Sequence, residues 1–154
     1  MKKLLLLLAI CAGSYAQAQT SPSKIDLYNQ GISAFKNMAF TESERYFREY
    51  IRQYPGEVYG YYWCFRSRQE IDRTLKMDVA REDALAFVRI AEQQKNTAQT
   101  LITAYQYLSS SDLEIHQNFN SSLSWVNKIL ELDPNNQWAV QQKVLIQSKI
   151  NRQG

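Results

Sequence analysis

The feature of this sequence that most restricts its fold is a pattern that occurs twice. Residues 39–56 (AFTESERYFREYIRQYPG) align without a gap, at one constant offset, with residues 118–135 (NFNSSLSWVNKILELDPN). Large apolar, small and proline positions coincide, as in the pairs Phe40 and Phe119, Ser43 and Ser122, and Pro55 and Pro134. Such self-similarity predicts a chain built from stacked copies of one structural unit.

A third copy lies between these two. The constant offset leaves room for two helix-pair units of about 34 residues each and a short insertion. Residues 81–96 (REDALAFVRIAEQQKN) place Ala84, Val88 and Ala91 at the spacing of Ser43, Phe47 and Tyr50. In all three segments apolar residues recur every three or four positions, which is typical of amphipathic helices. Each segment follows another helical stretch, and one more stretch ends the chain. The sequence therefore predicts an all-α protein of about seven helices, which form three antiparallel pairs and one unpaired last helix.

The breaks between units have a physical cause. Pro134 cannot continue a helix, since it lacks an N–H group and disfavours helical geometry in Asp133. Asn135 or Asn136 can then accept hydrogen bonds from the first N–H groups of the next helix. So short a break makes neighbouring helices lie antiparallel and in contact. The last helix is expected to cover the open end of the stack with its apolar residues, Trp138, Val140, Val144 and Leu145, while Gln and Lys face outward.

The pattern resembles the tetratricopeptide repeat (TPR) family. Its positions are matched in the first unit by Gly31, Ala34, Phe40, Ser43, Phe47 and Pro55, and in the third by Tyr105, Leu108, Ser109, Phe119, Ser122, Val126, Ile129 and Pro134. The resemblance implies a solenoid of antiparallel helix pairs. It places repeats at about residues 24–57, 58–101 and 102–136 and a capping helix at 137–152, within one domain of residues 24–154.

The second unit departs from the family pattern. Phe65 occupies the place of the small residue where the two helices of a unit cross, and Arg68 the place of an aromatic residue. About seven additional residues, around residues 72–78 (DRTLKMD), lengthen the turn between its helices. We expect this crossing to be wider and the turn to protrude.

The resemblance also implies a concave groove lined by the first helix of each unit. By register, its residues are Tyr28, Asn29, Ile32, Phe35, Tyr59, Tyr62, Trp63, Arg66, Gln69, Gln106 and Ser110. Aromatic rings interspersed with amide and guanidinium groups suit a peptide or protein partner. Alternatively, the rings fill the core of a short array. Chaperone-binding members of the family clamp a terminal carboxylate with Lys and Asn, but the matching positions here hold Tyr28 and Ile32, so that role is not implied.

The N-terminus has the layout of a secretory signal peptide at residues 1–18, followed by a short linker at 19–23. A basic start precedes an apolar run of seven residues from Leu4 to Ile10, and Ala18 ends an Ala-x-Ala site. The run is too short for a stable membrane span. We therefore expect an exported, periplasmic protein. The alternative is a lipoprotein anchored through Cys11, although Ile10 fits poorly before a lipidated cysteine.

Charge and residue content argue against nucleic acid binding and catalysis. Without Lys2 and Lys3 the chain carries 16 basic and 15 acidic side chains, interspersed, so no basic stripe predicts a nucleic acid partner. Cys64 would be the only cysteine after cleavage; it is interpreted as a buried apolar residue, with a reactive thiol or an intermolecular disulfide bridge as the alternative. A single histidine, His116, leaves no metal cluster and no catalytic triad. We expect no enzyme activity, metal or cofactor.

The function that the sequence favours is a non-enzymatic interaction or scaffold module of the bacterial cell envelope. It would hold a protein or peptide partner in the aromatic groove. A second hypothesis is a structural subunit of an outer-membrane complex, with a lipid anchor at Cys11 as one form of it. A third is an accessory to a cell-wall enzyme. The sequence leaves open the partner's identity, the oligomeric state and the binding face.

Overall fold

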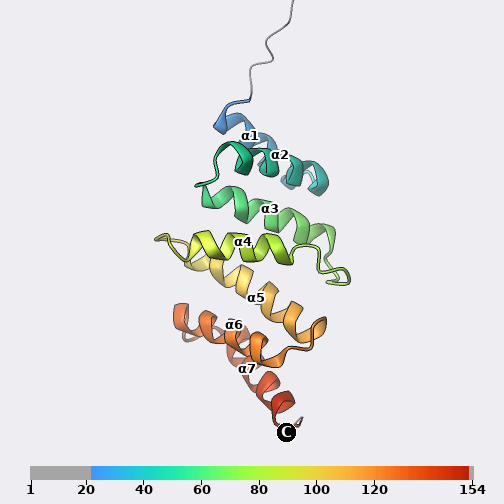
Figure 1. Ribbon diagram of the computed structural model, residues 1–154, viewed down its shortest axis with the longest axis vertical. Helices are drawn as coiled ribbons and strands as arrows, with labels where there is room; N and C mark the ends of the chain where they lie inside the picture. The colour runs from blue at the N-terminus through green and yellow to red at the C-terminus, as the bar shows by residue number, and fades with distance from the viewer. Residues whose placement is uncertain (1–21, 153–154) are drawn as a thin grey trace, which may run out of the picture.

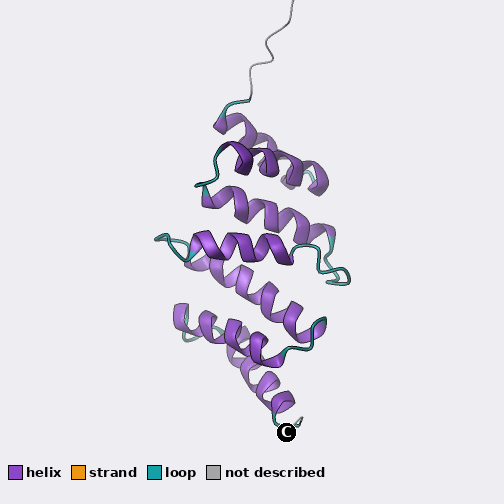
Figure 2. Cartoon of the chain, in the orientation of Figure 1, coloured by secondary structure: helices purple, strands orange, loops and turns teal. Residues whose placement is uncertain are grey.

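The computed structural model describes residues 22–152, and within this range the chain forms seven helices and no strand (Figures 1 and 2). The helices are α1 (Lys24–Lys36), α2 (Phe40–Gln53), α3 (Val58–Ile71), α4 (Arg81–Ala91), α5 (Ala98–Glu114), α6 (Phe119–Leu132) and α7 (Gln137–Ile150). The predicted all-α solenoid of about seven helices is confirmed. The signal peptide, Cys11 and most of the expected linker lie outside the described residues.

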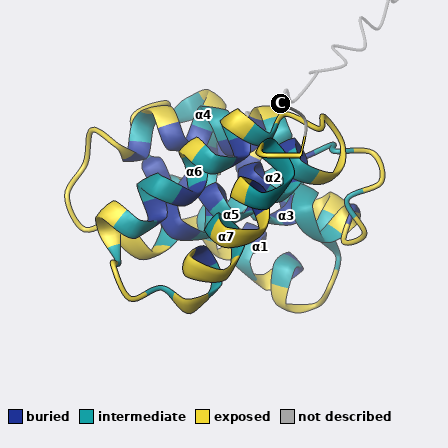
Figure 3. Cartoon of the chain, turned by 90° about the horizontal axis from the view of Figure 1, so that it is seen from below, coloured by how far each residue is buried: buried dark blue, intermediate teal, exposed yellow. Residues whose placement is uncertain are grey.

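The helices follow one another along the long axis of the molecule and lie across it, each antiparallel to the next (Figure 1). Contacts run between consecutive helices, with α1 also touching α3. Buried residues line the facing sides of the helices, and exposed residues concentrate in the turns at the edges of the stack (Figure 3). Among the helices described, none combines the length and the apolar character that crossing a membrane requires.

The end of α6 and the start of α7 are set by the residues that the sequence analysis identified. Asp133 is extended before Pro134, and the Asn136 side chain accepts a hydrogen bond of 3.1 Å from the backbone N–H of Ala139. At the start of α1, Ser23 and Asp26 form a reciprocal capping box. The expected cap at Asn136 is thus confirmed.

Small residues let the helices of the first and third pairs approach closely. The buried Ser43 hydroxyl donates a 3.0 Å hydrogen bond to the carbonyl oxygen of Gly31, across α1 and α2. A Cβ atom at position 31 would lie 2.6 Å from the ring of Phe47, which is fully buried. In α5 and α6, Ser109 and Ser122 take the same places, and their hydroxyl oxygens are 2.9 Å apart.

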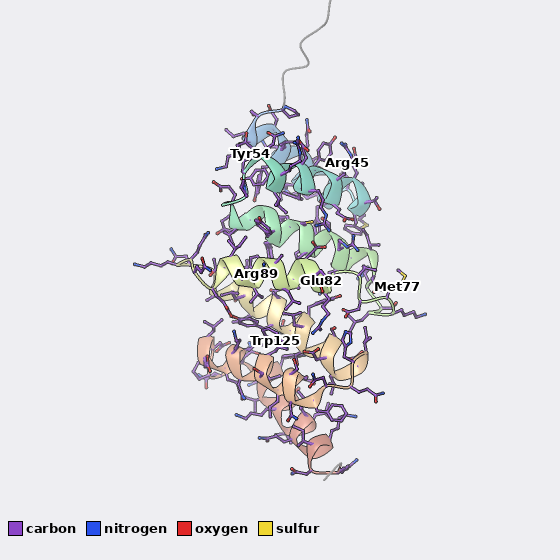
Figure 4. The ribbon with its side chains drawn as sticks, viewed as in Figure 1. Arg45, Tyr54, Met77, Glu82, Arg89 and Trp125 are labelled. Carbon is purple, nitrogen blue, oxygen red and sulfur yellow. The ribbon has the colours of Figure 1, made fainter. Side chains whose placement is uncertain are left out.

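The middle pair is built differently, as its sequence predicts. Phe65 is fully buried at the crossing of α3 and α4, and these two helices pack less extensively than α1 with α2 or α5 with α6. The long turn between α3 and α4 protrudes from the stack, with Met77 exposed at it (Figure 4). Next to Phe65, Cys64 is 1% exposed, which confirms its interpretation as a buried residue.

The prediction for the inner face of α7 is wrong. Ala139 and Ile146 are fully buried, whereas Val140, Val144 and Leu145 are 47%, 66% and 43% exposed. Apolar residues occupy more than one side of this helix, and contact with α6 decides which side is covered. Trp138 is partly buried against the core.

Candidate functional site

A polar hollow of about 460 Å³ lies between α3, α5 and α7, the first helices of successive units. Its lining residues come from these helices and from the turn after α3: Arg66, Gln69, Glu70, Arg73, Thr74, Leu75, Thr103, Gln106, Tyr107, Ser110, Glu114 and Trp138. We call this the α3–α5–α7 hollow. Four of the eleven predicted groove residues, Arg66, Gln69, Gln106 and Ser110, meet in it.

Two polar atoms in the hollow lack a hydrogen-bond partner. Within residues 22–152, Arg66 Nε and Gln69 Oε1 are the buried side-chain nitrogen or oxygen atoms for which none is found. Buried polar groups in proteins are almost always paired, and an unpaired one costs about 1–3 kcal/mol. One atom is a donor and the other an acceptor, on neighbouring turns of α3.

The charges of the hollow are balanced. Glu70 accepts a 3.3 Å hydrogen bond from a terminal guanidinium nitrogen of Arg66 and lies 3.3 Å from Nε of Arg73. Glu114, at the far end of α5, adds a second carboxylate to the two arginines. The hollow has no net charge, so it is not built for a highly charged ligand.

One wall of the hollow is the additional turn of the middle unit, and α5 holds this turn in place. Asp78 accepts hydrogen bonds from the Tyr107 hydroxyl at 2.8 Å and the Ser111 hydroxyl at 2.7 Å, and His116 Nε2 lies 2.8 Å from it. Burial, together with the bond to Asp78, raises the pKa of the Tyr107 phenol, which therefore stays protonated as a donor. The wall is fixed by one side of α5 and by His116 just after it.

Inside the turn, the backbone adopts conformations that few side chains tolerate. Leu75, which lines the hollow, has φ +54°, and Asp78 has φ +51°. The Asp72 carboxylate accepts hydrogen bonds from the backbone N–H groups of Lys76 at 3.0 Å and Met77 at 2.8 Å. These bonds hold the left-handed residues in place, so the wall keeps one shape.

Four other predicted groove residues take part in aromatic packing between the helices. Ring centroids are 5.9 Å apart for Tyr28 and Phe47, 5.0 Å for Phe35 and Trp63, and 5.4 Å for Tyr62 and Phe87. Ile32 packs against the core cluster that contains Phe47 and Tyr50. These rings fill space between units, as the alternative interpretation proposes, and each stays partly accessible.

The two remaining predicted residues, Asn29 and Tyr59, are exposed away from the hollow. Conversely, sequence reasoning missed the other eight lining residues: Glu70, Arg73, Thr74, Leu75, Thr103, Tyr107, Glu114 and Trp138. The offset that aligns the two copies of the pattern places Trp138 at the position of Tyr59, so the repeat itself could have identified Trp138 as a groove residue. The turn residues carry no comparable signal, because they lie outside the repeat.

A larger hollow, of about 680 Å³, follows the surface of α2, but its charged groups have partners. Arg52 pairs with Glu49 on its own helix, and Arg48 pairs with Glu44 and, at 2.7 Å, with Asp83 of α4. The Arg45 guanidinium stacks 4.3 Å from the ring centre of Tyr46. This surface is satisfied by the chain itself, which leaves the α3–α5–α7 hollow as the candidate site. Within residues 22–152, no group of three or more His, Cys, Asp and Glu could hold a metal ion.

No protein-family model and no curated protein sequence matches the chain. Among solved structures, it is similar to the C-terminal part of a TPR repeat-containing protein from Cytophaga hutchinsonii, with a TM-score of 0.74 and 21% identity over 80% of this chain. The chain spans 48% of that structure. It is also similar to the Arabidopsis OM64 TPR domain, with a TM-score of 0.62 and 14% identity, covering 81% of this chain and 94% of that domain. The chain therefore has the tetratricopeptide-repeat fold that its sequence predicts.

Proposed function

We propose that this chain is a non-enzymatic protein-interaction module that binds a peptide segment of a partner protein in the α3–α5–α7 hollow. The helix-pair fold supports an interaction role in general, since such arrays present extended surfaces for partners. The observation that carries the proposal is the pair of unpaired buried atoms, Arg66 Nε and Gln69 Oε1.

A peptide group offers what these two atoms lack. Both atoms are covered in the free chain, so the Arg66 and Gln69 side chains turn toward the hollow when the peptide binds. The carbonyl oxygen of the peptide group then accepts a hydrogen bond from Arg66, and its N–H donates one to Gln69. A ligand that makes both bonds removes two desolvation penalties of about 1–3 kcal/mol each. The balanced charge favours the neutral peptide backbone over an isolated phosphate or carboxylate. Trp138 adds aromatic surface against which a side chain of the peptide can pack.

The setting we propose is the bacterial cell envelope. It is supported by the basic start, the apolar run and the Ala-x-Ala site near the N-terminus. The second hypothesis, a structural subunit of an outer-membrane complex, is supported by Cys11, which could carry a lipid anchor. Mass spectrometry of the mature N-terminus separates the two, because a free protein begins at Gln19 and an anchored one at a lipidated Cys11.

The test is capture of the partner by crosslinking in cells, with the double variant R66A/Q69A. We expect recovery of the crosslinked partner to fall at least tenfold, which corresponds to about 1.4 kcal/mol, less than one charged hydrogen bond is worth. The matched control is R89A/Q93A, which removes the same two residue types from exposed positions. Arg89 lies near the end of α4 (Figure 4), and Gln93 lies just after this helix. Both variants should keep the helical circular dichroism spectrum. Undiminished recovery with R66A/Q69A would exclude the hollow as the binding site.

A further inference from the structure

Helices α3 and α7 occupy equivalent places in the array. Each begins at the third position after a proline, and the offset that relates α2 to α6 also relates α3 to α7. The faces turned to the preceding helix correspond: Gly60 and Ser67 of α3 are buried against α2, and their counterparts Ala139 and Ile146 are buried in α7. The equivalence therefore holds in the structure as well as in the sequence.

The adjacent faces of the two helices, about a quarter turn further round, differ. In α3 this face carries Tyr61 and Phe65, and α4 packs on it, so that Phe65 is fully buried. The counterparts in α7 are Val140 and Val144, which are 47% and 66% exposed. Within residues 22–152 no helix covers this side of α7. We call the surface formed by Val140, Lys143, Val144 and Gln147 the forward face of α7.

The charge of the forward face indicates which charge a partner must carry there. Lys143 is the counterpart of Cys64, whose sulfur lies 3.9 Å from the Asp83 carboxylate of α4. Gln147 is the counterpart of Arg68, which lies 3.4 Å from the same carboxylate and 2.9 Å from Glu44 of α2. In α3, this face therefore points at an acidic residue of the helix that covers it. In α7, the position next to Val144 holds a lysine, and the helix contains Lys149 but no acidic residue.

We propose that the forward face of α7 docks an amphipathic helix of another protein in the position that α4 takes on α3. The docked helix places apolar side chains on Val140 and Val144 and a carboxylate against Lys143. Neither Lys143 nor Lys149 has a carboxylate within ion-pair distance in the described part of the chain, whereas interior junctions are joined by pairs such as Arg81 and Asp112 at 2.8 Å. The docked helix supplies the missing acidic partner.

A second copy of this chain fits the face less well. Two α7 helices packed on each other would bring together only lysines, because α7 has no acidic residue, and like charges across a contact are unfavourable. The surface is also separate from the α3–α5–α7 hollow, which uses Trp138 on another side of α7. The two proposals can therefore fail independently.

The probe for this proposal is a fluorescent peptide with the sequence of residues 78–95, which contains α4, added to the full-length protein. The matched control peptide differs only by D83K. We expect fluorescence anisotropy to show binding of the first peptide and at least tenfold weaker binding of the second, because the second places a lysine opposite Lys143. The variant K143E should reverse the preference between the peptides.

The variant V144E tests whether the peptide binds at the forward face of α7. Val144 is exposed, so the substitution should leave the circular dichroism spectrum unchanged while reducing peptide binding at least tenfold. Binding that is equal for V144E and the unmodified protein, or no binding of either peptide, would overturn the proposal. So would sedimentation that shows a dimer abolished by V144E, since the occupant would then be a second copy. Partner capture through the hollow should be unaffected by V144E, which distinguishes this outcome from that of R66A/Q69A.

Discussion

The first and third helix pairs differ from the middle pair at the point where their helices cross. In the outer pairs, small residues meet: Gly31 with Ser43 and Ser109 with Ser122, each pair joined by a hydrogen bond. In the middle pair the fully buried ring of Phe65 takes this place. One repeat pattern therefore accommodates two ways of bringing helices together, close backbone contact or a large side chain as spacer.

The middle pair differs in a second way that concerns the site. Its additional turn, absent from the outer pairs, supplies Thr74 and Leu75 to the wall of the α3–α5–α7 hollow. The part of the chain that departs most from the repeat thus coincides with the candidate binding site. The regular pairs build the scaffold, and the irregular pair shapes the surface.

The largest loss of stability should come from removing the Phe65 ring, which separates α3 from α4. F65A deletes a fully buried ring that packs edge-on against Tyr107, with centroids 5.4 Å apart, and should reduce the free energy of unfolding by about 3–5 kcal/mol. Equilibrium urea denaturation measures the loss. The milder F65L should cost clearly less. If F65A costs below about 1 kcal/mol, far under the usual range for a buried ring, Phe65 is not what holds α3 and α4 in place.

A larger residue at Gly31, where α1 and α2 cross, should cause an intermediate loss of stability. A methyl group at position 31 meets the buried Phe47 ring at 2.6 Å, so G31A should destabilise the protein by about 1–2 kcal/mol, although alanine ordinarily favours a helix over glycine. The control S33A changes an exposed side chain of α1 and should leave the stability unchanged or raise it slightly. Thermal denaturation compares both. A stabilised G31A would show that close contact is not required there.

The smallest loss of stability should come from removing one hydroxyl of the Ser109 and Ser122 pair, where α5 and α6 cross. Ser122 donates a 2.9 Å hydrogen bond to the carbonyl oxygen of Ser109, and both residues are buried. S122A should therefore cost about 0.5–1.5 kcal/mol. The converse change A84S, at the corresponding position beside Phe65, should give no stabilisation, because the ring prevents the close approach. Chemical denaturation of the two variants decides whether the two kinds of crossing are distinct.

Most of the fold could be predicted from the sequence because it is encoded locally and repeated. Proline positions, the Asn136 cap and the small residues at the crossings each leave a direct mark on the sequence. The burial of α7 could not be predicted, since its apolar residues occupy several sides and only contact with α6 selects Ala139 and Ile146. This choice depends on a neighbouring helix and not on the pattern of α7 itself.

The candidate site was predictable only where it lies on repeat helices. Arg66, Gln69, Gln106 and Ser110 follow from the register, and Trp138 could have followed from the same offset. The wall formed by the turn could not, because left-handed residues such as Leu75 and Asp78 leave no distinctive sequence signal when they are not glycine. Whether the eleven predicted residues bind a partner stays a prediction for the crosslinking experiment.

The burial of Cys64 has a practical consequence. Burial, reinforced by the neighbouring Asp83 carboxylate, raises the pKa of its thiol to about 12, so at pH 8 only about one molecule in ten thousand carries the nucleophilic thiolate. Among the residues described, this is the single free sulfhydryl. The folded chain can thus pass through an oxidising environment without scrambling or cross-linking through this side chain, and reaction with an alkylating reagent would report that the array has opened.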